Sequence, residues 1–223
     1  MGEWWTYSLQ DFLLFSPRTY YRLFELHNRA VWPAQVPAMA LGLAALALSL
    51  RGGVRQGRAT AAILAASWLW VAWAYLLERY DTINWLAKYL AAAFTAEALL
   101  LAWAALRGRL TVRPDTGRVR RAGLGLLAFA LVLQPLTGLL LAGRPWAQVE
   151  LFGVTPDPTV VATLGVLLTA DRTRWELLVV PLAWCAVSGA TAWAMGSPDA
   201  PLMPAAALAT LALAGWKAQS RPR

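Results

Sequence analysis

Glu97 is the residue whose type and position most directly suggest chemistry in this chain. It lies near the middle of residues 84–106, an apolar stretch long enough to cross a bilayer as a helix. A charge at that depth costs about 2.5–3.5 kcal/mol on insertion scales, and such residues usually mark a pathway or an internal pair. We interpret Glu97 either as a proton-coupling or ligand-binding carboxylate, or as a protonated side chain that hydrogen-bonds a neighbouring helix.

Gln134 and Pro135 lie at a similar depth in another apolar stretch, residues 122–142. Proline has no N–H, so it frees a carbonyl one turn earlier, and helices broken in this way can line sites in membrane proteins. The Gln134 amide is a suitable partner for Glu97, and together they form a candidate midplane site. The alternative is a proline that bends the helix without any role in binding.

A second candidate site lies in the loop of residues 143–159, GRPWAQVELFGVTPDPT, which three prolines stiffen. Together with a neighbouring loop it provides six polar or aromatic candidates for the outer face: Asn84, Lys88, Arg144, Trp146, Glu150 and Asp157. The alternatives are structural. Asp157 followed by Pro158 is typical of a helix N-cap with proline at the first helical position, and Arg144 and Glu150 could pair with Asp81 or Arg79 on the facing loop.

The single cysteine and single histidine limit other chemistry. They exclude an intrachain disulfide and a Cys/His metal cluster, so we expect no metal and no cofactor. Cys185 lies mid-depth in an apolar stretch, where we interpret it as a packing residue because no partner is present to activate it.

The composition predicts an all-α, polytopic transmembrane helix bundle. The chain is 59% hydrophobic and only 14% charged, with a mean hydropathy of +0.48, unlike an ordinary soluble domain. The predicted spans are residues 31–50, 59–77, 84–106, 122–142, 158–170, 175–195 and 201–216. Residues 158–170 are short enough to form a re-entrant helix instead, which would leave six crossings.

The charged residues favour seven crossings. The net charge of +8 comes from arginines and lysines in the loops after the first, third, fifth and seventh spans, whereas the alternate loops are acidic. Because positive residues stay cytoplasmic, the N-terminus is predicted outside and the C-terminus inside. This pattern accounts for the positive charge without nucleic-acid binding. We divide the chain into an interfacial segment (1–30), a transmembrane domain (31–217) and a basic cytoplasmic tail (218–223).

The N-terminal segment is aromatic and amphipathic. Ser16 and Pro17 predict the start of a helix, and Glu25 and Arg29 form a favourable pair one turn apart. Its aromatic residues suit the headgroup level of a membrane: Trp4, Trp5, Tyr7, Tyr20 and Tyr21. The alternative to an interfacial helix is one docked on a loop outside the membrane.

At EWWTYSLQDFLLFSPRTYYRLFELHNRAVWP, YDTINW and GRPWAQVELFGVTPDPT, the chain resembles a bacterial family of multi-pass inner-membrane proteins, the domain of unknown function 6064. The resemblance covers essentially the whole chain. It implies an integral protein of the bacterial inner membrane and supplies no reaction, substrate or catalytic residue.

Function is left between three classes. We rank first a small-molecule transporter or channel-like protein with its site around Glu97 and Gln134. The alternative is a membrane-embedded binding, sensory or assembly subunit that docks a partner protein through its aromatic N-terminal helix. A membrane enzyme on lipid-like substrates ranks third, because no nucleophile–base pair and no HExxH, Walker or GxSxG motif is present. The lipid bilayer is the one partner expected in all three cases, and homo-oligomerisation is left open.

Overall fold

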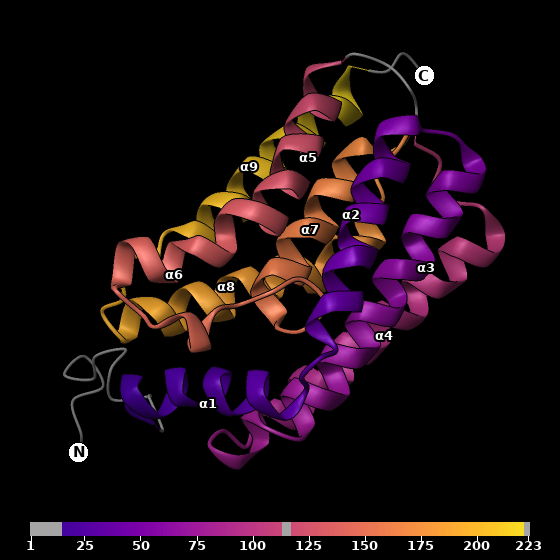
Figure 1. Cartoon of the computed structure of the whole chain (residues 1–223). Helices are drawn as coiled ribbons and strands as arrows, with labels where there is room; N and C mark the ends of the chain where they lie inside the picture. The colour runs from indigo at the N-terminus through magenta and orange to yellow at the C-terminus, as the bar shows by residue number, and fades with distance from the viewer. Residues whose placement is uncertain (1–14, 113–116, 221–223) are drawn as a thin grey trace, which may run out of the picture.

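The computed structural model describes residues 15–112 and 117–220, and these residues confirm the prediction of an all-α fold (Figure 1). No β-strand is formed within these two ranges, where isolated bridges alone occur. The α-helices are α1 (Pro17–Ala30), α2 (Gln35–Arg51), α3 (Val54–Trp70), α4 (Ala87–Arg107), α5 (Arg118–Ala128), α6 (Gln134–Ala142), α7 (Pro156–Thr169), α8 (Val179–Ala194) and α9 (Leu202–Gln219). Two π-helical segments, η3 (Val71–Leu77) and η5 (Phe129–Leu133), continue α3 and lead into α6.

Helix α7 is the centre of the bundle. Every residue of α7 except Asp157 is buried, which explains why its sequence is apolar on all sides rather than on one face. It contacts α3, α5, α8 and α9. The approach to α5 is closest at Gly123 and Gly165, where a Cβ atom on Gly165 would lie 2.7 Å from the Gly123 carbonyl oxygen. The two glycines therefore allow the helix backbones to touch.

The basic loops gather at one end of the bundle, the upper end in Figure 1. Backbone bridges join Gly53 to Val112 and Val112 to Ala170, so three separate loops meet there. Arginine and lysine side chains cap helix ends at this place: Arg58 Nε donates to the Ala105 carbonyl at 2.9 Å, and Lys217 Nζ donates to the Leu168 carbonyl at 3.0 Å. Cations at helix C-termini are stabilising.

Helix α1 lies across the opposite end, the lower end in Figure 1. Its predicted start is confirmed, because the Ser16 side chain accepts from the Thr19 N–H at 3.2 Å with Pro17 at the first helical position. The predicted ion pair of Glu25 with Arg29 is also present, at 2.7 Å. The helix then turns through 96° into α2.

The aromatic face of α1 packs onto the bundle. Phe24 stacks on Tyr75 with ring centroids 5.3 Å apart, and Tyr20 meets Tyr80 edge-on at 6.0 Å. These aromatic side chains therefore pack against other residues of the same chain. The N-terminal residues Trp4, Trp5 and Tyr7, which we predicted at the headgroup level, lie outside the described residues, as does the last part of the basic tail.

Within residues 15–112 and 117–220, four helical segments are long and apolar enough to cross a membrane: Val54–Thr82, Ala87–Arg107, Arg118–Ala142 and Trp175–Ala194. A fifth results if α1 and α2 are counted as one broken span. Helix α7 is too short to be counted with them, although it runs between the two ends of the bundle, from the α1 end to the Val112 bridge at Ala170. Seven crossings stay a prediction.

His27 ties α1 to the loop before α7 and makes that contact sensitive to acid. Its Nε2 lies 3.1 Å from the Val154 carbonyl oxygen, which can only accept, so Nε2 carries the proton of a neutral ring. Burial lowers the pKa of His27 to about 4, opposed by the hydrogen bond to Val154.

We expect acid to loosen α1 through this residue. An unfolded histidine has a pKa of about 6.5, so the unfolded state binds more protons between that value and pH 4, and about 3 kcal/mol of stability present at neutral pH is lost across this window. The test compares thermal unfolding of wild type and His27→Gln in detergent as the pH is lowered. Glutamine keeps a donor for the Val154 carbonyl and does not titrate. The difference in melting temperature between wild type and His27→Gln should therefore narrow as the pH falls. A constant difference would show that His27 does not sense pH.

Candidate functional site

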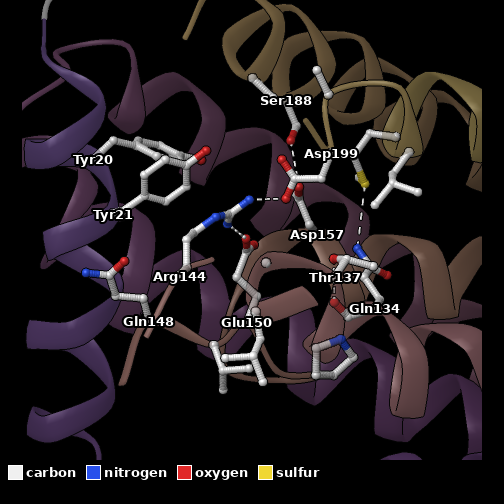
Figure 2. A pocket seen from close by; sticks show the side chains of 18 of the residues that line it. Tyr20, Tyr21, Gln134, Thr137, Arg144, Gln148, Glu150, Asp157, Ser188 and Asp199 are labelled. Carbon is white, nitrogen blue, oxygen red and sulfur yellow. Dashed lines mark hydrogen bonds and ion pairs between the residues drawn. The ribbon is translucent and has the colours of Figure 1, made fainter. Parts of the chain in front are cut away.

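A small polar cavity lies at the α1 end of the bundle, between α1, α6, the loop 143–155, α7, α8 and the loop that joins α8 to α9 (Figure 2). Its volume is about 40 Å³. Its lining includes an aromatic ring, an amide and four charged side chains: Tyr21, Gln134, Arg144, Glu150, Asp157 and Asp199. We call it the Arg144 pocket.

Arg144 is the central cation of the pocket and is buried, with 8% of its surface exposed. Gly143, in the left-handed conformation with φ +60°, ends α6 and turns the chain so that the Arg144 N–H bonds the Gly138 carbonyl at 3.0 Å. The guanidinium forms ion pairs with Asp199 and, at 3.5 Å, with Glu150. Its carbon lies 4.1 Å from the centre of the Tyr21 ring, a cation–π contact.

Asp157 faces the same pocket and joins α7 to α8. Its two carboxylate oxygens accept from Trp184 Nε1 and from the Ser188 hydroxyl, each at 2.7 Å. The prediction that Asp157 is the N-cap of this helix is wrong. Thr155 holds the cap position in extended conformation and Pro156 is the first helical residue, so Asp157 is already inside the first turn and is bound by donors from α8 instead.

Gln134 enters the pocket from the predicted break in its helix. Pro135 cannot donate to the carbonyl one turn before it, and the chain adopts the π-helical segment η5 directly ahead of Gln134. Gln134 is 7% exposed, and its Nε2 donates to the Met203 sulfur at 3.8 Å. Its Oε1 is buried and has no hydrogen-bond partner in the part of the chain that the structure describes.

Glu97 does not meet Gln134. It is fully buried in α4, and neither of its carboxyl oxygens has a hydrogen-bond partner within residues 15–112 and 117–220. The hydrogen bond that we predicted between the two side chains is therefore absent. Gln134 belongs instead to the Arg144 pocket, whose lining does not include Glu97.

The predicted outer-face residues divide into two groups. Arg144, Glu150 and Asp157 meet in the pocket, and the expected pairing of Arg144 with Asp81 is wrong because its partners are Glu150 and Asp199. The other three residues lie elsewhere. Asn84 Nδ2 donates to the Tyr80 hydroxyl at 2.9 Å, Lys88 pairs with Asp81 at 3.6 Å, and Trp146 is 62% exposed.

Sequence reasoning missed Asp199, Ser188 and Tyr21 as members of the site. Asp199 lies in one of the loops described there only as acidic, Tyr21 was predicted only to lie at the headgroup level of a membrane, and Ser188 was not singled out. Each reaches the pocket through tertiary packing: Asp199 through its ion pair with Arg144, Ser188 through Asp157, and Tyr21 through the face of the guanidinium.

Glu150 is the acid of the pocket that most readily holds a proton. Burial raises the pKa of Glu150 well above its ordinary value, the nearby Asp157 carboxylate raises it further, and Arg144 acts in the opposite direction. Its side chain keeps 19% of its surface exposed, so protons from outside can reach it. No group of three or more His, Cys, Asp or Glu side chains in the described part of the chain could hold a metal ion.

The comparison with protein families identifies the chain. Residues 18–221 match the model of a family described as a family of unknown function (DUF6064). The chain belongs to this family. The match confirms the resemblance drawn from the aromatic and loop motifs, and the DUF6064 description assigns no reaction, ligand or partner. No curated protein and no solved structure matches the chain.

Proposed function

We propose that this DUF6064 protein is a small-solute transporter or channel-like protein of the bacterial inner membrane, with the Arg144 pocket as its binding site. The observation that carries the proposal is a group of buried charges at one end of an apolar helix bundle. Arg144, Glu150 and Asp199 are 9%, 19% and 13% exposed at their side chains. Removing each charged side chain of this kind from water costs roughly several kcal/mol. Ionisable groups that are kept among apolar helices despite this cost usually mark a functional site.

The distribution of charge supports an orientation. The basic loops lie at the end opposite α1, and positive loops stay cytoplasmic. The Arg144 pocket then faces outward, the N-terminus is outside and the C-terminus inside, as seven crossings require. The break at Gln134 and Pro135 fits this role, since irregular backbone inside a membrane protein is tolerated where it lines a cavity.

Two other functions have less support. A subunit that binds a partner through the aromatic residues of α1 would need those residues free, and Tyr20, Phe24 and Tyr75 pack against one another within the chain. An enzyme that acts by nucleophilic attack would need an activated nucleophile, and Cys185, the sole cysteine, is buried in α8.

The proposal is tested by transport in reconstituted liposomes. Wild type, Gln134→Leu and the control Lys88→Gln would be exposed to pooled metabolites and salts, with charge movement recorded on solid-supported membranes and internal pH followed with a trapped dye. We expect solute-dependent charge movement or pH change in wild type and in Lys88→Gln. In Gln134→Leu these signals should be about tenfold smaller, because the solute would lose a polar contact worth about 1.4 kcal/mol. The trapped dye detects exchange of protons that moves no net charge. Signals of equal size in protein-free liposomes would overturn the proposal.

A further inference from the structure

The Arg144 pocket contains more acid than base. Arg144 is the one cation that lines it, and three carboxylates face it within the described residues: Glu150, Asp157 and Asp199. Arg144 forms ion pairs with two of them, and its guanidinium face is covered by the Tyr21 ring. Its two Nη atoms therefore serve as the internal counter-ion of these carboxylates, whereas its Nε has no hydrogen-bond partner among the described residues.

Two acceptor groups remain open after the internal hydrogen bonds are counted. The Asp157 oxygens are taken by Trp184 and Ser188, and the Asp199 oxygens by Ser197 and Arg144. Glu150 makes its ion pair through Oε1 alone. Gln134 Oε1 is buried and has no hydrogen-bond partner among the described residues, although buried amide oxygens nearly always have one. An unfilled carboxylate and an unfilled amide oxygen both require a cation or a hydrogen-bond donor.

The size of the cavity limits what can bind. A volume of about 40 Å³ is enough for a small ion with one or two waters. No group of three or more His, Cys, Asp or Glu side chains that could hold a metal ion is present among the described residues. The one open carboxylate, that of Glu150, balances a single positive charge, which favours a small monovalent cation such as sodium, potassium or ammonium.

We propose that the Arg144 pocket binds one small monovalent cation between Glu150 and Gln134 Oε1, in exchange for the proton that Glu150 holds when the pocket is empty. This proposal names the coupling ion for the transport function above and rests on that function for its physiological meaning. On binding, the O–H bond of Glu150 breaks, the proton passes to bulk water, and the cation replaces it against the carboxylate. The net charge of the pocket is unchanged, so exchange requires no further buried charge.

Several groups surround Glu150 and set its proton affinity. Asp157, from α7, and Asp199, after α8, favour the protonated form, whereas Arg144 favours the ionised form. Tyr20 and Tyr21 from α1 and Tyr75 from η3 face the same region, and burial raises the pKa of Tyr20 and Tyr21, so both stay neutral near pH 7. Glu150 is thus the group that exchanges its proton.

The test measures cation binding directly on the purified protein in detergent. Sodium, potassium and ammonium chlorides would be compared with N-methyl-D-glucamine chloride at equal ionic strength, by thermal unfolding and by a pH dye in weak buffer. We expect one of the small cations to raise the melting temperature and to release about one proton per protein. The apparent affinity should fall about tenfold for each pH unit in the range where Glu150 is protonated.

Variants decide whether the pocket is the site. Glu150→Gln, which resembles the protonated acid, should lose both the cation response and proton release, and Gln134→Leu should bind about tenfold more weakly while still releasing a proton. Asp81→Asn, outside the pocket, should behave as wild type. Size-exclusion elution at the wild-type position confirms that each variant is folded, and Glu150→Asp, which keeps the carboxylate, should retain proton release.

Three outcomes would overturn the inference: an equal response to N-methyl-D-glucamine, an unchanged response in Glu150→Gln, or cation binding without proton release. Its failure is distinguishable from failure of the transport proposal. Cation binding in detergent without flux in liposomes contradicts transport alone, whereas flux without cation binding contradicts this inference alone.

Discussion

Replacement of Arg144 by methionine is expected to destabilise the protein by about 3–5 kcal/mol, because removing one partner of a buried ion pair leaves the other charge uncompensated. Asp199, whose side chain is 13% exposed, would lose its cation, and Glu150 would lose the guanidinium that lies 3.5 Å from it. Methionine keeps the aliphatic part of the side chain and loses the guanidinium, which also packs against Gly138 and the Tyr21 ring. The measurement is the midpoint of thermal unfolding in detergent, together with the yield of monodisperse protein.

The control for this prediction is Arg18→Met on α1, where the arginine is exposed. Surface charges of this kind contribute about 0–1 kcal/mol, so the melting temperature should scarcely change. Neutralising Asp199 as well, in the double variant Arg144→Met, Asp199→Asn, should recover part of the loss. An Arg144→Met protein as stable as Arg18→Met would mean that the pocket charges are solvated and that the site described above is not buried.

A second large effect is expected at the contact between α5 and α7. An alanine Cβ at Gly165 would lie 2.7 Å from the Gly123 carbonyl oxygen and 2.7 Å from the Leu127 backbone nitrogen. These are backbone atoms of a helix, so α5 as a whole must move away. We expect Gly165→Ala to cost about 1–3 kcal/mol, as overpacking usually does, and Gly165→Leu to prevent accumulation of folded protein.

Gly125 provides a matched control on α5, because a Cβ there meets nothing within 4 Å. Gly125→Ala should be neutral or stabilise by about 0.5–1 kcal/mol, the usual gain from replacing glycine in a helix. The same unfolding measurement covers both variants. Equal stability of Gly165→Ala and Gly125→Ala would show that the two helices are further apart than described.

Local features of this structure followed from the sequence. The start of α1 at Ser16 and Pro17, the pair of Glu25 with Arg29 and the irregular helix ahead of Pro135 each depend on residues within one turn of each other. Propensity, capping and the missing proline N–H act over that distance, so no tertiary information was needed.

The site did not follow in the same way. Glu97 and Gln134 lie at similar depths in the membrane along their predicted helices, which suggested that their side chains would meet. The depth of a residue does not determine which neighbouring helix its side chain faces. The side chain of Gln134 faces α9, where it contacts Met203, and Glu97 is buried in α4. Asp199 lies 55 residues from its partner Arg144, a pairing that only the packing of the helices defines.

The most direct test of the account compares Glu150→Gln with Glu97→Gln in the same reconstituted transport assay. Both substitutions replace an acid by its amide, and the two residues lie in the Arg144 pocket and in α4 respectively. We predict that Glu150→Gln abolishes solute- or cation-dependent signals whereas Glu97→Gln keeps them. Loss of the signals in Glu97→Gln with normal transport in Glu150→Gln would contradict the account and place the transport site at Glu97.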